Sequence, residues 1–188
     1  MSSGISRNDA LALLHEHVKN PSMIKHCLAS EAVLGALADR LGGDRERWAM
    51  AGLLHDLDVE LTNADLNIHG RESVKMLEAQ GVHPEIIEAV KLHNEMSCDE
   101  KRSKPLHFAL ASGETITGII TATALVYPDK KLASVKTKSI TKRMKEKAFA
   151  ASVNRDIIME CEKLGVPLPE FAEISLRAMQ SVSDELGL

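Results

Sequence analysis

The chain has 188 residues, of which 44% are apolar and 27% are charged, and its formal net charge is −4. These values are typical of one globular domain with its own core, and they exclude a disordered chain. The negative charge and an aromatic share of only 3% argue against a nucleic-acid polymer as partner, because such partners need cations and stacking side chains. Eight histidines are unusual in a chain so poor in aromatic residues, and they direct the search for function.

No segment has the composition of a membrane span or a leader. The most apolar stretch, residues 106–127, is interrupted by His107 and Glu114. The N-terminus has no basic region followed by an apolar one. The cysteines are three in number and have no CxxC spacing, which argues against a disulfide framework. We therefore expect a cytoplasmic protein with no membrane partner.

The N-terminal part of the chain is expected to form three helices. Apolar residues recur there at spacings of three and four, as on one face of a helix. Asn20 and Asp44 are candidate N-caps for the second and third helices, and Gly42 is a candidate C-cap for the second. We expect helices over residues 8–18, 21–41 and 45–57 and a loop over residues 58–68.

The rest of the chain is also expected to be helical. Gly81, Pro84 and Pro128 mark helix boundaries, because glycine ends helices and proline opens or stops them. The helices are expected over residues 69–80, 85–96, 106–126, 137–151, 155–164 and 169–186. No repeat or long linker divides the chain, so we predict one all-α domain over residues 1–188.

Several polar side chains lie on helical faces that are otherwise apolar. His26, His55 and His93 each continue an apolar stripe, Asp56 follows His55, and Glu114 is the only acid in its apolar helix. A buried carboxylate is costly unless it is paired or binds a cation. One buried histidine is most often an ordinary core residue. Several together with carboxylates indicate a site for Mn, Fe, Co, Ni or Zn.

The order of these residues resembles a known signature. His26, then His55-Asp56, then Glu114 is similar to the H…HD…D signature of the HD superfamily of metal-dependent phosphohydrolases. The string GLLHDLD resembles the HDIG-type branch of that superfamily. The similarity continues over residues 92–95, 114–132 and 138–155. The resemblance implies a single-domain helical bundle around a metal site, with a metal-binding core at about residues 21–127 and C-terminal helices at about residues 137–187.

The resemblance also implies a ligand set for one or two divalent ions, which would be Mn, Fe, Co, Ni, Mg or Zn. The first ion would be held by His26, His55, Asp56 and Glu114. In binuclear members two further histidines hold a second ion and Asp56 bridges the two ions; the corresponding residues here are His69 and His93. His69 opens an expected helix after a loop, so it is either a ligand or an ordinary surface residue.

Two positions depart from the family pattern. Glu114 stands where the family usually has aspartate, and its extra methylene shifts the ligating oxygen. Asp58 stands where many relatives have glycine. It either lies behind the metal ligands, holds a metal-bound water or faces solvent. Asp56 and Asp58 are the candidate catalytic residues.

A phosphorylated substrate needs cationic side chains. Residues 130–147 contain seven lysines and one arginine against a single acid, a local excess that favours an anionic ligand on that side of the protein. A solvated helix face explains most of these lysines equally well. The candidate substrate-binding residues are Arg71, Lys75, Lys138, Lys142 and Lys145.

These features predict a hydrolase of a small phosphorylated substrate, a phosphomonoester or a nucleotide, in which a metal-activated water attacks phosphorus. Two alternatives stay open. A di-iron oxygenase requires both His69 and His93 as ligands, and a non-catalytic regulatory module would bind a nucleotide or a metal. Apolar positions on the last long helix could support a homo-oligomer; they are Phe171, Ile174 and Met179.

Overall fold

The structure is a computed structural model that describes residues 2–188, and every regular element within that range is helical. This confirms the predicted all-α fold. The α-helices are α1 (Arg7–His17), α2 (Pro21–Leu41), α3 (Arg45–Leu54), α4 (Arg71–Ala79), α5 (Pro84–His93), α6 (Pro105–Leu125), α7 (Thr137–Arg143), α8 (Arg155–Ile158), α9 (Leu168–Ser181) and α10 (Ser183–Leu186). The 3₁₀ helices are η1 (Glu95–Ser97), η2 (Leu132–Ser134) and η3 (Met159–Leu164).

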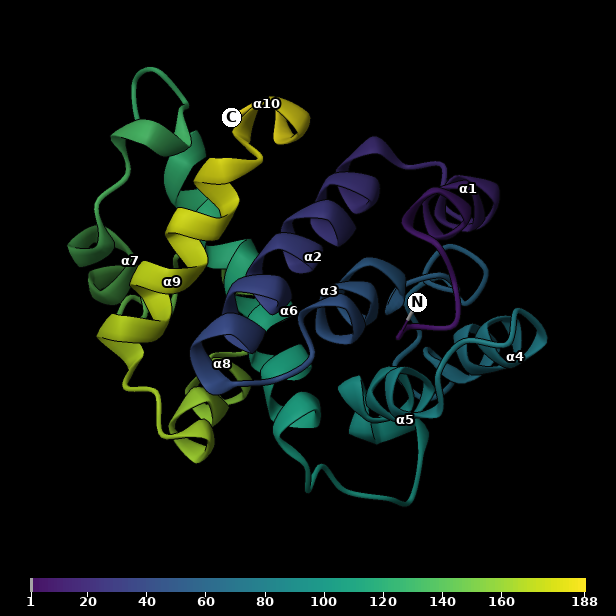
Figure 1. The fold of residues 1–188 in the computed structure, drawn as a ribbon. Coiled ribbons are helices and arrows are strands. Elements are labelled where there is room, and N and C mark those ends of the chain that lie inside the picture. The colour runs from purple at the N-terminus through teal and green to yellow at the C-terminus, as the bar shows by residue number, and fades with distance from the viewer. Residues whose placement is uncertain (1) are drawn as a thin grey trace.

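Helix α6 is the centre of the fold. It packs against α2, α5 and α9, and it passes behind α2 and α9 in Figure 1. By length and composition alone α6 could cross a membrane, but 61% of its most apolar window is buried inside the protein. A helix that is apolar on all sides is stable in water when other helices surround it. The apolar character of α6 is therefore explained by its central position.

The paired helices α2 and α3 approach each other closely at a glycine. A Cβ atom added to Gly52 in α3 would lie 2.5 Å from the backbone oxygen of Ser30 in α2. Only glycine allows the two backbones to come this close. The contact fixes the C-terminal end of α3, where His55 lies, against the middle of α2, where His26 lies.

The C-terminal helices are shorter than predicted. The expected helix over residues 137–151 ends at Arg143, because the following carbonyl groups turn toward a side chain. The guanidinium group of Arg155 donates hydrogen bonds to the carbonyl oxygens of Ala150 and Val153, at 2.9 and 2.7 Å. Ala150 itself has a φ of +44°, which no helix tolerates. This non-helical segment leads into α8, whose N-cap is Asn154.

The apolar face expected on the last long helix is not exposed. Phe171 and Met179 are fully buried in the core, and Ile174 is partly buried. Helix α9 packs against α2, α6 and α7, which cover these side chains. The sequence pattern identified an amphipathic helix correctly but assigned its apolar face to a partner chain instead of the core.

Candidate metal centre

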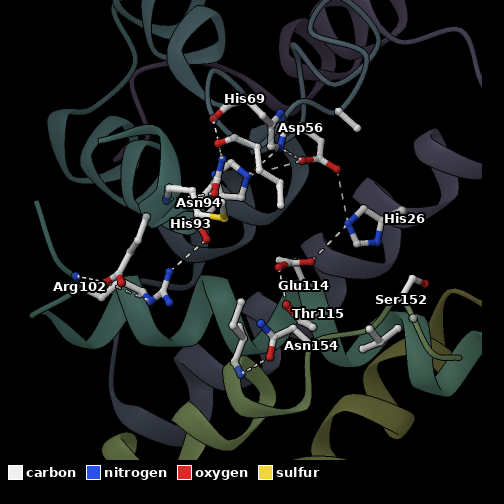
Figure 2. Close-up of a pocket in the computed structure, with 17 residues that line it drawn as sticks. His26, Asp56, His69, His93, Asn94, Arg102, Glu114, Thr115, Ser152 and Asn154 are labelled. Carbon is white, nitrogen blue, oxygen red and sulfur yellow. Dashed lines mark hydrogen bonds and ion pairs between the residues drawn. The ribbon is translucent and has the colours of Figure 1, made fainter. Parts of the chain in front are cut away.

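Six side chains of the kinds that bind metal ions converge from distant parts of the chain. They come from five local structures: α2, the end of α3, the loop before α4, the end of α5, and α6. All but His55 line one cavity in the middle of the molecule (Figure 2), and Nε2 of His55 lies 3.1 Å from Nε2 of His26. They are His26, His55, Asp56, His69, His93 and Glu114. The structure thus brings together all of the predicted metal ligands.

The six side chains form two groups. In each group, one potential ligand atom per residue lies within 4.8 Å of the others. The first group is His26, His55 and Glu114; its two histidine Nε2 atoms are 3.1 Å apart, and Oε2 of Glu114 is 3.7 Å from Nε2 of His26. The second group is Asp56, His69 and His93; its two Nε2 atoms are 3.0 Å apart.

Asp56 lies between the two groups. Its Oδ1 atom is 3.0 Å from Nε2 of His69 and 3.4 Å from Nε2 of His55. Its Oδ2 atom is 3.6 Å from Nε2 of His26. One carboxylate therefore contacts histidines of both groups. A bridging ligand needs this position, and the family resemblance implied that role for Asp56.

Hydrogen bonds at Nδ1 fix the orientation of three histidine rings. The Nδ1 atom of His55 lies 2.9 Å from the carbonyl oxygen of Gly52, and that of His93 lies 2.5 Å from the carbonyl oxygen of Val90. The Nδ1 atom of His26 lies 3.0 Å from Oγ1 of Thr117. An acceptor at Nδ1 places the proton there and leaves a lone pair on Nε2, directed at the centre of the site.

The donor set fits divalent ions. The two Nε2 atoms of each group lie 3.0–3.1 Å apart. Metal–nitrogen distances of about 2.1 Å allow two nitrogens at such a separation to ligate the same ion. Imidazole nitrogen with carboxylate oxygen suits Mn, Fe, Co, Ni and Zn. The described residues could hold one ion in each group.

Asp58 lies behind His69 and does not line the cavity. Its carboxylate is fully buried, and Oδ1 is 2.8 Å from Nδ1 of His69. The same carboxylate accepts backbone N–H hydrogen bonds from Gly70, Glu72 and Ser73, at 2.9, 3.0 and 3.2 Å. It thus holds the N-terminus of α4 and positions His69. Of the alternatives open from the sequence, this position supports the one behind the ligands, and it does not support a direct catalytic role.

The two carboxylates that face the site have pKa values shifted in opposite directions. Burial would raise the pKa of Asp56, but His55, His69, His26 and His93 outweigh it and hold that pKa well below its ordinary value. Burial raises the pKa of Glu114 to about 8, and the charge of Asp56 adds to the effect. Without a cation, the site therefore stabilises one ionised carboxylate and opposes a second.

The pKa values of three histidines in the site are also shifted in opposite directions. Burial lowers the pKa of His26 to about 4 and that of His93 to about 3, and the proximity of His55 adds to both shifts. Burial would also lower the pKa of His69, but contact with Asp56 and Asp58 outweighs burial and raises it to about 10. His26 and His93 are thus neutral at pH 7, as metal ligands must be.

The two groups lie at the floor of a cavity of about 580 Å³. One wall comes from the C-terminal part of the chain, through residues 152–154 and 157, outside the predicted metal-binding core. The lining includes polar residues that the sequence did not single out: Asn94, Arg102, Thr115, Ser152 and Asn154 (Figure 2). Asn154 has an N-cap signal in the sequence, whereas Arg102 is one of several charges in an irregular connector and carries no pattern.

None of the five predicted substrate-binding residues lines the cavity. On α4, Nε of Arg71 donates to the carbonyl oxygen of Ser97, and Lys75 pairs with Glu72 in solvent. The remaining three are exposed lysines on or just after α7, which packs on α9 and α6 away from the metal groups: Lys138, Lys142 and Lys145. A local excess of charge thus does not indicate where a helix lies relative to the cavity, and substrate binding by these residues stays a prediction.

A family model described as "HD domain" matches residues 23–118, just over half of the chain. The matched range contains all six side chains of the two groups. No curated protein and no solved structure matches the chain.

Proposed function

The chain belongs to the HD domain family, and from that premise we propose that it hydrolyses a small phosphorylated molecule with the help of one or two divalent metal ions. One observation carries the proposal: six side chains of the kinds that bind metal ions lie together, and five of them line a cavity large enough for a small substrate. Four of the six are histidines, and three of those rings are held with Nε2 pointing inward. Such preorganisation is typical of a metal site.

Each group has a distinct role in this proposal. His26, His55 and Glu114 would hold one ion, and Asp56, His69 and His93 would hold the other. A divalent ion bound there lowers the pKa of a water ligand toward about 7 and neutralises charge on a phosphoryl oxygen. Asp56 would balance the cationic charge of the site, and residues 152–154 form part of the wall beside it.

The second group also meets one condition of the di-iron oxygenase alternative, since His69 and His93 lie together with Asp56. The identity of the resident metal separates the two functions. Protein purified without a chelator and analysed by elemental mass spectrometry should contain Mn, Co, Ni, Zn or Mg if it is a hydrolase. Two irons per chain, together with oxygen consumption, would favour the oxygenase.

Hydrolysis is tested with p-nitrophenyl phosphate in the presence of added Mn²⁺, Co²⁺, Ni²⁺ or Mg²⁺. We expect metal-dependent turnover that falls by at least about 100-fold in Asp56→Asn, because the variant loses the charge shared by both groups. His15→Ala is the matched control, since His15 is an exposed residue of α1. If the ester is not hydrolysed with any metal, or if Asp56→Asn keeps full activity, the hydrolase proposal is wrong.

We also propose a cytoplasmic protein whose partner is a small anionic molecule, not a membrane or a nucleic-acid polymer. All three cysteines are free, which fits a reducing compartment. The net charge of −4 and the small number of aromatic side chains give no support for binding a polyanion.

A further inference from the structure

We infer that the substrate carries one phosphoryl group on an uncharged, largely apolar organic part, and that it is not a polyphosphate such as a nucleoside triphosphate. The inference rests on the proposed function and names the substrate class of the same cavity. Three features of the cavity wall support it: the absence of a free cation among the described lining residues, an apolar rim, and the oriented amide of Asn154.

Arg102 is the one lysine or arginine among the described residues that line the cavity, and its guanidinium group is already bound. Nε is 2.8 Å from Glu160, and Nη1 donates to the carbonyl oxygens of Leu92 and His93 at 2.9 and 3.1 Å. Nη2 lies 3.4 Å from the other oxygen of Glu160. The side chain is only 6% exposed. Arg102 therefore ties α5 to η3 and has no free pair of donors for a phosphate.

The cavity also carries acidic side chains. Besides Asp56 and Glu114 at the floor, Glu95 lies in the lining, with its pKa lowered although burial alone would raise it, because it accepts from the backbone of Arg102 and lies near cationic side chains. Ions held at the floor neutralise the phosphoryl group that reaches them. A second or third phosphate would lie among carboxylates with no cation to pair with, which is unfavourable.

The rim of the cavity is apolar and exposed. Leu66 is 49% exposed and Met96 is 64% exposed, and both line the cavity. Val153 and Ile157 add further apolar surface. Large apolar side chains left in water at the mouth of a cavity favour a ligand that covers them. No Phe, Tyr or Trp is among the described lining residues, so the wall offers no ring on which a nucleobase could stack.

Asn154 supplies one oriented polar contact. Its Oδ1 atom accepts the backbone N–H groups of Asp156 and Ile157, at 3.0 and 3.3 Å. This leaves its amide nitrogen on the side that faces the cavity (Figure 2). A neutral donor at this position suits a hydroxyl or carbonyl oxygen of the organic part and does not neutralise an additional charge.

The test measures binding to metal-loaded protein by calorimetry, with ligands that cannot be hydrolysed. Hexylphosphonate represents one phosphoryl-like group on an apolar chain, methylphosphonate lacks the chain, and a methylene-bridged analogue of ATP represents polyphosphates. We expect hexylphosphonate to bind at least about tenfold more tightly than the other two ligands. Equal or tighter binding of the ATP analogue would overturn the inference, and so would equal binding of methylphosphonate.

A double variant, Leu66→Ser with Met96→Ser, tests the rim directly. Both side chains are exposed, so the variant should fold, and its affinity for hexylphosphonate should fall about tenfold while that for methylphosphonate stays the same. The matched control is Leu125→Ser with Val126→Ser, which are 49% and 56% exposed and lie outside the cavity lining. An unchanged affinity in the Leu66 and Met96 variant would contradict the assignment of the rim.

Binding and turnover distinguish this inference from the proposed function. If hexylphosphonate binds as expected but no phosphomonoester is hydrolysed, the ligand class is supported and the hydrolase function fails. If monoesters are hydrolysed but nucleoside triphosphates are cleaved with a higher kcat/KM than hexyl phosphate, the function stands and the inference is wrong.

Discussion

The single side chain of Asp58 positions other residues of the site, although it does not itself line the cavity. It accepts three backbone N–H groups at the start of α4 and contacts Nδ1 of His69. A buried carboxylate with this many donors is strongly stabilised, and it fixes the ring whose Nε2 points at Asp56. A charged side chain thus joins the N-terminus of α4 to His69, a candidate metal ligand.

Asp58→Asn should therefore weaken one metal group and spare the other. The amide nearly matches the carboxylate in shape, but it has one acceptor oxygen in place of two and no charge to orient His69. We expect the affinity of the second ion to fall by about 10–100-fold while the first ion stays bound. Titration calorimetry and metal stoichiometry measure this effect. Asp99→Asn, an exposed change, should have no effect, and unchanged affinity for both ions in Asp58→Asn would exclude the positioning role.

Helical periodicity could predict most of the site because burial on an apolar face is a local property. It identifies His26, His55, His93 and Glu114 as inward-facing residues from their spacing alone. The same criterion applies equally to His107, which is fully buried, yet its Nδ1 accepts backbone N–H groups at the start of α6 and it does not line the cavity. Helical periodicity therefore identifies which side chains are buried. Only the resemblance to a family signature separated the candidate ligands from the other buried histidines.

The contacts of Asp58 and Arg102 could not be predicted from the sequence. Each contact depends on the path of an irregular segment, residues 58–70 for Asp58 and residues 97–105 for Arg102. Such segments have no helical periodicity from which their path could be predicted. The position of the lysines of residues 130–147, away from the cavity lining, could not be predicted for a related reason. Their charge is evident in the sequence, but the direction of α7 depends on its packing against α9.

At the scale of elements, the distance between α2 and α3 sets the geometry of the first metal group. His26 lies on α2 and His55 follows α3, and the two helices touch where Gly52 meets the backbone of Ser30. His55 also uses the carbonyl oxygen of Gly52 to orient its ring. A change in helix separation at this point is transmitted directly to the 3.1 Å contact between the two Nε2 atoms.

Gly52→Ala should destabilise the protein, because the new methyl group would lie 2.5 Å from the backbone oxygen of Ser30 and backbone atoms cannot move aside cheaply. We expect a loss of about 1–3 kcal/mol in the free energy of unfolding, measured by urea denaturation, and weaker binding of the first ion. Gly35→Ala is the control. Its methyl group would meet the side chains of Arg45, at 3.4 Å, and Ala49, at 3.7 Å, without touching backbone atoms, and alanine favours helix, so stability should rise or stay unchanged. Equal effects of the two substitutions would contradict this explanation.

The helix boundaries were predictable where side chains cap the helix. Asn20 and Asp44 accept backbone N–H groups at the starts of α2 and α3, as their sequence positions suggested. Helix α4 instead begins after Gly70, which has a φ of +97°, and Asp58, twelve residues away, provides the acceptor. A cap from another part of the chain cannot be recognised in a local window.

At the scale of the whole molecule, the candidate metal centre joins segments that are far apart in the sequence. Its potential ligands come from α2, the end of α3, the loop before α4, the end of α5 and α6, so they span positions 26 to 114. A cation bound by all of these segments exists only in the folded protein. Binding therefore stabilises the native state as a whole, in addition to any role in chemistry.

Removal of metal should consequently lower the melting temperature of the whole protein in one cooperative transition. An ion present at about 100 times its Kd adds about 2.7 kcal/mol to the free energy of unfolding. For a chain of this size, each kcal/mol corresponds to about 2–4 °C in Tm, so a chelator should lower Tm by about 5–10 °C. Calorimetric scans with and without a chelator measure the shift, which restored Mn²⁺ or Zn²⁺ should reverse. Glu114→Gln should respond less, since it loses a ligand of the first group, whereas His15→Ala should respond like the unmodified protein. If the chelator leaves Tm unchanged in protein shown to contain metal, the ion does not bridge these segments.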